Sequence, residues 1–437
     1  MFKKNKSQFF ILLFVISLGF LLRYHNYAIY PRHGATFDEF AWTWLGINLI
    51  QKGVPISWSP HPQYKERKEI RYQGAAFLIV KPYLEHPPLF GIVAGTSALL
   101  SGAKDMYSVT LTNMRGLSAV LGILSIVALF IFTNSLYGKT IAYVSTILYA
   151  TVPTIVIGSR IVQNENFLIP FWLFSLYLIN KYLQTKKLWM RNIASVIGGL
   201  LILAKVPWIV VPLSLGMILF YKGKWKDALF VGGVAAGFFS LFIAYGLYFD
   251  KELFVNLFQL QVARYDISFD GLFSIFTHPL LVDRYYLDGW ILFGWVSIFY
   301  ISKDIKKHLF VLLPFISYFV LYVFAIPNEP GHGWYRYPFY PFLISALAFV
   351  LEEERKKLSF LTLFFALIVG FALLQNVWKE AFGFSFVVYR SFILVVIVPM
   401  LYFIWKNRKD RMPQLFLCLL VTIFIIFNIF SVIVYVE

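Results

Sequence analysis

Apolar stretches long enough to cross a membrane follow one another along almost the whole chain. Each covers roughly 17–25 residues, which is the length that a helix needs to cross the hydrocarbon core of a bilayer. They lie near residues 8–27, 116–134, 140–158, 166–183, 226–249, 286–302, 308–326, 337–351, 359–377, 388–405 and 413–436. With 59% hydrophobic and 14% charged residues, the composition excludes an ordinary water-soluble protein. The sequence therefore predicts an all-α polytopic membrane protein.

A further apolar run, at residues 192–221, is too long for one span and is interrupted at Lys205-Val206-Pro207. Basic clusters flank this run on both sides, and basic loops prefer the cytoplasm. We therefore expect two short helices that enter the membrane and return, with their turn at Lys205. Together with the other stretches, this gives about 13 transmembrane helices. Lys3, Lys4 and Lys6 place the N-terminus in the cytoplasm.

The positions of the basic residues account for most of the formal net charge of +17. If residues 87–102 lie on the outer surface, the basic clusters of the later loops all face the cytoplasm. These clusters are Lys181–Arg191, Lys222–Lys226, Lys303–Lys307, Arg355–Lys357 and Lys406–Arg411. The charge thus reflects topology, and it does not indicate nucleic-acid binding. The resulting prediction is one transmembrane domain at 1–437, with outer loops at 28–113, carrying juxtamembrane helices and carboxylates, and at 250–285.

Ionisable residues gather near helix ends on the predicted outer side, and helix interiors hold few of them. They are Asp38, Glu39, His86, Arg160, Glu165, Lys205, His332 and Arg336. Each has an ordinary explanation: Asp38 can cap a helix, and Arg160 or Lys205 can anchor or snorkel at the lipid surface. An ion-coupled carrier keeps such residues near the midplane. Their position at the outer boundary favours chemistry on a lipid head group.

In order and spacing, these segments resemble glycosyltransferases of the C superfamily, in the group of protein O-mannosyltransferases and lipid A aminoarabinose transferases. The matching motifs are Asp38-Glu39, Glu85-His86-Pro87-Pro88-Leu89, Arg115 with Leu136-Tyr137-Gly138, Ser159-Arg160 with Glu165, and Leu203-Ala204-Lys205. They cover most of residues 10–215. The chain departs from the family pattern at Glu165, where Asp is usual, and at Val206-Pro207.

The resemblance implies an enzyme that moves a hexosyl or pentosyl group from a dolichyl or undecaprenyl phosphate donor. The acceptor would be a protein, lipid or glycan on the outer face of a prokaryotic plasma membrane. Asp38 would be the general base, with inversion at the sugar carbon. Arg160, Lys205 and Arg336 would bind the donor phosphate, and His86 would bind it too or orient the acceptor. Glu39 and Glu165 would orient the base and acceptor or complete a site for Mg, Mn or Zn, and Trp42, Tyr83, His332 and Tyr335 would bind substrate.

Two other kinds of protein that act on polyprenyl-linked sugars are alternatives. A flippase or transporter would line a midplane cavity with ionisable residues, which are sparse here. A polysaccharide polymerase or ligase would act through an outer loop dominated by arginine, whereas the carboxylate pair after the first helix favours a transferase. The single cysteine, Cys418, excludes an intramolecular disulfide framework.

Overall fold

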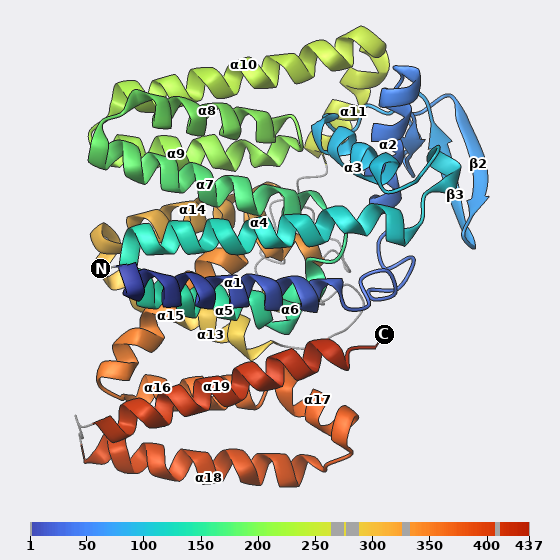
Figure 1. Ribbon diagram of the computed structural model, residues 1–437. Helices are drawn as coiled ribbons and strands as arrows, with labels where there is room; N and C mark the ends of the chain where they lie inside the picture. Colours follow the sequence, from blue (N-terminus) through green and yellow to red (C-terminus); the bar gives the residue numbers. More distant parts are fainter. Residues whose placement is uncertain (1, 264–274, 277–287, 326–332, 407–410, 437) are drawn as a thin grey trace.

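The computed structural model describes residues 2–263, 275–276, 288–325, 333–406 and 411–436. Most helices run side by side in one elongated bundle, and a smaller group of elements with a three-stranded sheet lies at one end of it (Figure 1). The longer elements are α1 (Phe2–Tyr24), α4 (Leu111–Tyr137), α5 (Lys139–Thr151), α6 (Pro153–Gly158), α7 (Asn164–Thr185), α8 (Leu188–Ile202), α9 (Val210–Tyr221), α10 (Trp225–Phe249), α11 (Lys251–Ala263), α13 (Gly289–Ile301), α14 (Ile305–Ala325), α15 (Tyr340–Lys356), α16 (Phe360–Gly370), α17 (Leu373–Phe382), α18 (Phe386–Trp405) and α19 (Arg411–Ile433).

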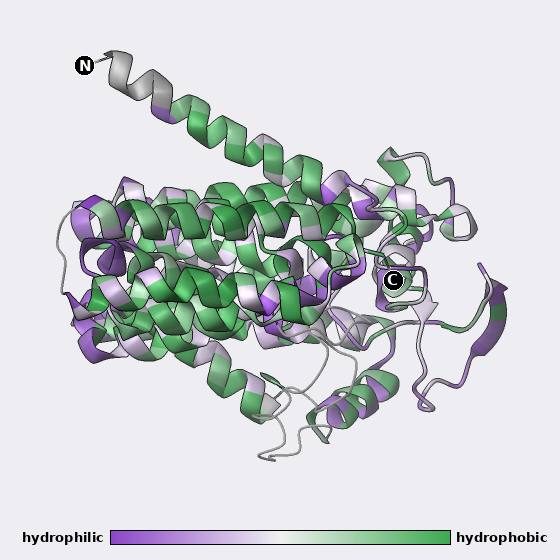
Figure 2. Cartoon of the chain, turned by 90° about the horizontal axis from the view of Figure 1, so that it is seen from below, coloured by the Kyte–Doolittle hydropathy of each residue, from purple (hydrophilic) through white to green (hydrophobic). Residues whose placement is uncertain are grey.

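Hydrophobic residues cover the length of the bundle, and hydrophilic residues collect at its ends (Figure 2). By length and composition, five segments of the described chain can cross a membrane: Leu111–Tyr137, Trp225–Phe249, Gly289–Phe324, Phe386–Trp405 and Arg411–Ile433. The bent pair α16 and α17 gives a sixth if it is one span. The predicted helical membrane protein is therefore confirmed, whereas the predicted number of about 13 spans is not.

The chain reverses direction between α8 and α9, as predicted. These helices lie beside each other, and α10 packs along both (Figure 1). The turn contains Lys205, in an extended conformation, and the short 3₁₀ helix η2 (Val206–Ile209). Pro207 has no N–H to donate and would clash with the preceding turn, so α8 cannot continue through it. Lys205 consequently lies at the tip of a helical hairpin.

The end group contains α2 (Asp38–Lys52), α3 (Leu89–Leu100) and a sheet that the sequence analysis missed. The sheet has the order β1-β3-β2, with β1 (Ser57–Trp58) and β2 (Arg67–Tyr72) both antiparallel to β3 (Ala75–Val80). Gln73 and Gly74 join β2 to β3 with positive φ angles, as a tight hairpin requires. The β2 sequence, Arg-Lys-Glu-Ile-Arg-Tyr, has too little polar–apolar alternation to predict a strand.

Aromatic contacts hold this sheet against the start of α2. The Phe77 ring of β3 lies 5.1 Å from the Phe37 ring, 5.6 Å from Phe40 and 5.0 Å from Trp44. Such edge-to-face contacts between buried rings stabilise packing beyond the area that they bury. The sheet therefore supports the helix end that carries Asp38.

Helices α2 and α3 cross at unusually short distance because glycines face each other. A Cβ atom added to Gly46 would overlap the carbonyl oxygen of Gly91, and one added to Gly95 would overlap the backbone at Gly46. This crossing sets the start of α3, and hence His86 just before it, beside α2.

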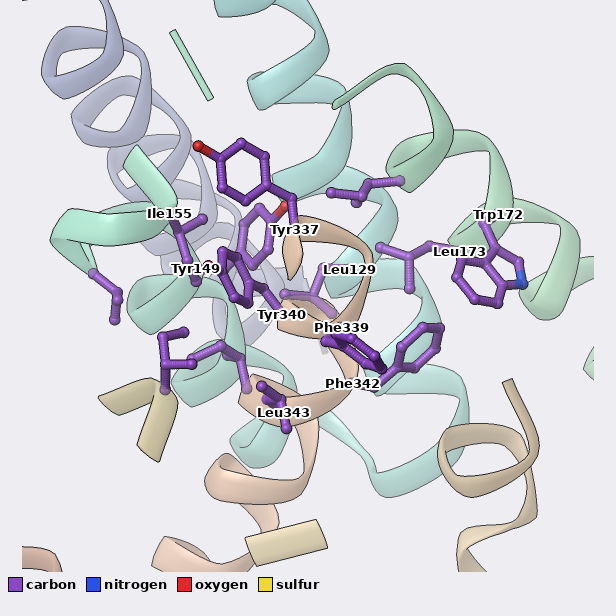
Figure 3. Packing of buried hydrophobic residues seen from close by; sticks show 14 of the residues in the cluster. Leu129, Tyr149, Ile155, Trp172, Leu173, Tyr337, Phe339, Tyr340, Phe342 and Leu343 are labelled. Atoms are coloured by element: carbon purple, nitrogen blue, oxygen red, sulfur yellow. The ribbon is translucent and has the colours of Figure 1, made fainter. Parts of the chain in front are cut away.

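Buried aromatic residues fill the centre of the bundle. Tyr337 and Phe339 of the 3₁₀ helix η4 (Gly333–Phe339), with Tyr340 of α15, lie among side chains of α4, α5 and α7 (Figure 3). The Tyr318 hydroxyl donates to the Tyr335 carbonyl at 2.6 Å and fixes η4 to α14. The core thereby brings a segment distant in sequence to the end of the bundle that carries α2.

Candidate active site

Asp38 is the first residue of α2, and its side chain is half-buried. The N-cap is Phe37, and no side chain caps the helix, so Asp38 is not the helix cap that it could have been from sequence alone. Its Oδ2 lies 3.4 Å from Gln163 Nε2, and its backbone N–H points to Thr36 Oγ1 at 3.3 Å. The carboxylate thus remains reachable while one oxygen has a partner.

Glu39 points away from Asp38 and into the interior. Its side chain is 1% exposed and that of Arg115 is fully buried. Arg115 Nε donates to Glu39 Oε1 at 2.9 Å and its NH2 group to Oε2 at 2.7 Å, which is a bidentate ion pair. Arg115 also donates to the carbonyls of Tyr27 and Pro31. These contacts give Glu39 a structural role instead of the predicted role beside the base or acceptor.

Glu165 and Lys205 form a second buried ion pair. Lys205 Nζ donates to Glu165 Oε1 at 2.8 Å, and the lysine is 8% exposed. The ammonium also lies 4.7 Å from the ring centre of Tyr335. Burial by itself lowers the pKa of Lys205, but Glu165, followed by Tyr335 and to a smaller extent Asp38, outweighs burial and raises the pKa. The lysine therefore remains a cation.

Backbone contacts fix the turn that carries Lys205. Asn164 Nδ2 donates to the Ala204 carbonyl at 3.1 Å, and Trp208 Nε1 donates to Asn164 Oδ1 at 3.0 Å. The N–H of Leu89 donates to the Leu203 carbonyl at 2.9 Å. The start of α3 and the Lys205 turn are thus joined directly.

His86 is half-buried beside this junction. Its ring lies 5.0 Å from that of Trp42. With Glu85 and Val206 it lines a small cleft of about 110 Å³ whose apolar side includes Phe242 and Phe254. The structure therefore places His86 close to the Lys205 turn.

Arg160 has other partners. It is 1% exposed, its NH2 group donates to the Leu22 carbonyl at 2.9 Å, and NH1 lies 3.5 Å from the Tyr30 carbonyl. Backbone carbonyls of α1 and the following loop thus replace the predicted donor phosphate. Arg336, in η4, is buried beside Tyr340. His332 lies outside the described residues.

The aromatic residues predicted to bind substrate differ in access. Trp42 and Tyr83 are buried, so neither offers an open face for stacking on a sugar. Burial, and then the charges of Glu85 and Tyr64 and that of Asp38, raise the pKa of Tyr83, so its phenol keeps the proton. Tyr335 is half-buried next to Lys205 and is the one of these three that a ligand of Lys205 can contact.

The predicted metal site at Glu39 and Glu165 does not fit the structure. Each carboxylate is paired with a different cation, and the described residues contain no group of three His, Cys, Asp or Glu that could hold a metal ion. Divalent metals such as Mg²⁺ need several oxygen ligands around one point. We derive no step through a metal.

A long apolar groove begins next to the Lys205 turn. It runs between α9 and α10 to Leu313 of α14 and has a volume of about 1030 Å³. Its lining is almost entirely apolar and includes Ile209 of η2, Met217 and Phe220 of α9, and Phe239 of α10. One end of this apolar surface thus lies at Ile209, in the turn that also contains Lys205.

The fold has known counterparts. The family model described as dolichyl-phosphate-mannose-protein mannosyltransferase matches residues 85–248. The ArnT structure from Cupriavidus metallidurans bound to undecaprenyl phosphate is similar at 14% identity and a TM-score of 0.58, covering 97% of this chain and 77% of that one. The oligosaccharyltransferase AglB from Archaeoglobus fulgidus, in complex with an inhibitory peptide and a dolichol-phosphate, has 13% identity and a TM-score of 0.53 over 99% of this chain.

The chain shares its fold with ArnT and AglB. The resemblance predicted from the sequence is thereby confirmed. The chain spans 56% of the length of AglB, and the apo form of the same oligosaccharyltransferase gives the same coverage at a TM-score of 0.54. Comparison with curated protein sequences finds no significant match.

The sequence analysis missed several residues that contact the predicted site residues. Arg115 was noted only as part of a motif, although it neutralises Glu39. His61 Nε2 lies 3.5 Å from Glu85 Oε2, and Gln163 contacts Asp38. For Gln163 the available signal was its place just before an apolar helix, next to Glu165. For His61 no periodicity or motif indicated a contact.

Proposed function

We propose that the protein is a membrane glycosyltransferase that moves a sugar from a polyprenyl-phosphate donor to a hydroxyl of a protein, lipid or glycan. The observation that carries this proposal is the turn before α7, where Gln163 contacts Asp38 and Glu165 pairs with Lys205, together with the apolar groove that includes Ile209 of the Lys205 turn. One site thus offers an apolar surface, a cation and a carboxylate base. The structures of ArnT with undecaprenyl phosphate and of AglB with dolichol-phosphate support a lipid-linked donor.

The groove suits the polyprenyl chain. Its walls on α9 and α10 also include exposed residues such as Leu213 and Trp225, so it opens sideways toward the lipid. An isoprenoid has no polar groups and gains by leaving water for such a surface. Its phosphate would then lie at the η2 end, where Lys205 is located.

Lys205 would hold the donor phosphate. Its ammonium has three donors, and Glu165 Oε1 and the Tyr335 ring account for part of its surroundings. The phosphate gains negative charge as the sugar leaves, so a fixed cation stabilises the transition state more than the ground state. His86, on the other side of the Leu89–Leu203 contact, and Arg336 are further proposed phosphate ligands.

Asp38 would act as the general base. It takes the proton of the acceptor hydroxyl while that oxygen attacks the anomeric carbon, and the bond from this carbon to the phosphate oxygen breaks. The products are the glycosylated acceptor, polyprenyl phosphate and a protonated Asp38. Attack opposite the leaving phosphate inverts the configuration at the sugar carbon.

The proposed topology places this site outside a prokaryotic plasma membrane, with the N-terminus in the cytoplasm. Single cysteines introduced near Lys187, Lys224, Lys306, Lys357 and Lys409 on a Cys418→Ser background should resist an impermeant thiol reagent on intact cells. Cysteines at Lys68, Glu165 and His332 mark the external side, and Lys68, which is exposed, is expected to react most readily. External labelling at both Lys187 and Lys224 would reverse the assignment.

Replacement of Lys205 tests the phosphate site. Lys205→Met should weaken binding of a short-chain polyprenyl phosphate by about 10–100-fold, because a charge-assisted hydrogen bond to phosphate contributes roughly 1.5–3 kcal/mol. The binding is measured by calorimetry on purified protein. Glu165→Gln is the matched control, since it removes the partner of Lys205 but keeps the cation, and it should retain binding.

The double variant Lys205→Met/Glu165→Gln separates folding from binding. It removes both buried charges, so it should regain stability lost in Lys205→Met while binding stays weak. Normal binding in the double variant would leave the donor phosphate without its proposed site. A flippase would then be favoured if the protein still moved polyprenyl-linked sugars across vesicles without transferring them.

A further inference from the structure

The turn before α7 places the Gln163 side chain in contact with the proposed base, Asp38. Gln163 is 1% exposed, and its carbonyl accepts hydrogen bonds from the N–H groups of Asn166 and Phe167 at the start of the helix. Its backbone is therefore fixed by the beginning of α7. Its side chain reaches across to α2.

The side-chain amide has three partners, all on or just before α2. Nε2 lies 3.0 Å from Thr36 Oγ1 and 3.4 Å from Asp38 Oδ2, and Oε1 lies 3.4 Å from Trp42 Nε1. An indole N–H only donates and an ionised carboxylate only accepts. Trp42 therefore determines that the N–H end of the amide faces Asp38.

The same turn holds the neighbouring residue of α2. The N–H of Val162 donates to Glu39 Oε1 at 2.9 Å. Val162 thus contacts Glu39, and Gln163 contacts Asp38. Beyond Gln163, Glu165 pairs with Lys205. The segment of residues 163–165 consequently contacts both the proposed base, through Gln163, and the proposed phosphate ligand, through Glu165.

We propose that Gln163 is a positioning residue that orients the Asp38 carboxylate, an inference that rests on the proposed function. Its amide holds Oδ2, which leaves Oδ1 to accept the proton of the acceptor hydroxyl. It also ties the base to the segment that carries Glu165. Small errors in the placement of a base reduce the rate strongly, because the reacting atoms must be held in an attack geometry.

Substitution of Gln163 by Met removes the N–H donor and keeps the length of the side chain. With radiolabelled short-chain polyprenyl-phosphate sugars, Gln163→Met should lower the single-turnover rate by about 10–30-fold. The dissociation constant for the unlabelled polyprenyl phosphate should change by less than about 2-fold, since the amide does not contact the phosphate. Gln163→Asn, which withdraws the amide but keeps the site polar, should act in the same direction and serves as the second variant if Met disturbs folding.

Asn166→Ala is the matched control in the same turn. The Asn166 side chain donates to the carbonyls of Gly158 and Ile161, which belong to α6 and the turn before α7 and lie outside α2. Each variant is also combined with Asp38→Asn, which distinguishes an effect on the Asp38 carboxylate from a general effect on the structure. Gln163→Met should cost little in an Asp38→Asn background, because its effect acts through the carboxylate, whereas Asn166→Ala should change the rate by the same factor in both backgrounds.

The inference is overturned if Gln163→Met turns over like the wild type. It is also overturned if weaker phosphate binding explains the loss, or if the loss is equal with and without Asp38. These results differ from failure of the proposed function, in which Asp38→Asn itself retains wild-type turnover.

Discussion

Asp38→Asn should lower the turnover of a short-chain polyprenyl-phosphate sugar by about 10²–10⁴-fold. Asparagine has nearly the same size as aspartate but cannot accept the proton of the acceptor hydroxyl. Donor affinity should change little, because Lys205 and the groove remain. Radiolabelled transfer and calorimetric binding of polyprenyl phosphate measure the two quantities separately.

Asp105→Asn is the matched control for this prediction. Asp105 is an exposed carboxylate at the same end of the molecule and caps the 3₁₀ helix η1 (Met106–Ser108), which asparagine also does well. It should leave turnover within about 2-fold, as usual for an exposed site. Wild-type turnover in Asp38→Asn would exclude Asp38 as the base and direct attention to Glu165, the other buried carboxylate near Lys205.

Loss of one partner of the Glu39–Arg115 pair should produce the largest loss of stability. Arg115→Met or Glu39→Gln leaves a buried charge without its counter-ion, which typically costs about 3–5 kcal/mol. Arg115→Met also removes the donors to the carbonyls of Tyr27 and Pro31 and should loosen the loop before α2. Unfolding by denaturant in detergent micelles measures the free energy.

The exposed pair of Lys356 and Glu353 provides the comparison. Its two atoms are 2.8 Å apart, nearly the same as in the buried pair, but its side chains are 58% and 39% exposed. Lys356→Met should therefore change stability by only about 0–1 kcal/mol. Equal effects at the two pairs would contradict a structural role for Arg115. The variant Glu39→Gln/Arg115→Met should be more stable than Arg115→Met alone.

Much of the fold was predictable because long apolar stretches and helix breakers act locally. Pro207 after Lys205 predicts the reversal between α8 and α9, since proline disfavours a continuous helix here and the basic clusters on both sides favour the same side of the membrane. The hairpin of β2 and β3 was not predictable in the same way. Its stability depends on Phe77 meeting Phe37 and Trp44, which are distant in sequence.

The sequence likewise predicted some features of the site and not others. Motif order drew attention to Asp38 and Lys205, and residues 163–165 contact the first through Gln163 and the second through Glu165. Sequence gave no means to tell Arg160 from Lys205, because both are cations near outer helix ends. Only the fold shows that Arg160 donates to the carbonyls of Leu22 and Tyr30, whereas Lys205 pairs with Glu165.

The sideways opening of the groove on α9 and α10 has a kinetic consequence. A ligand that enters through this opening diffuses in two dimensions within the bilayer, and an acceptor from the aqueous side diffuses in three. Saturation by the donor is then governed by its mole fraction among the surrounding lipids rather than by its amount per volume of solution. The same number of donor molecules spread over more lipid supports a slower reaction, so membrane area becomes a variable that sets the rate.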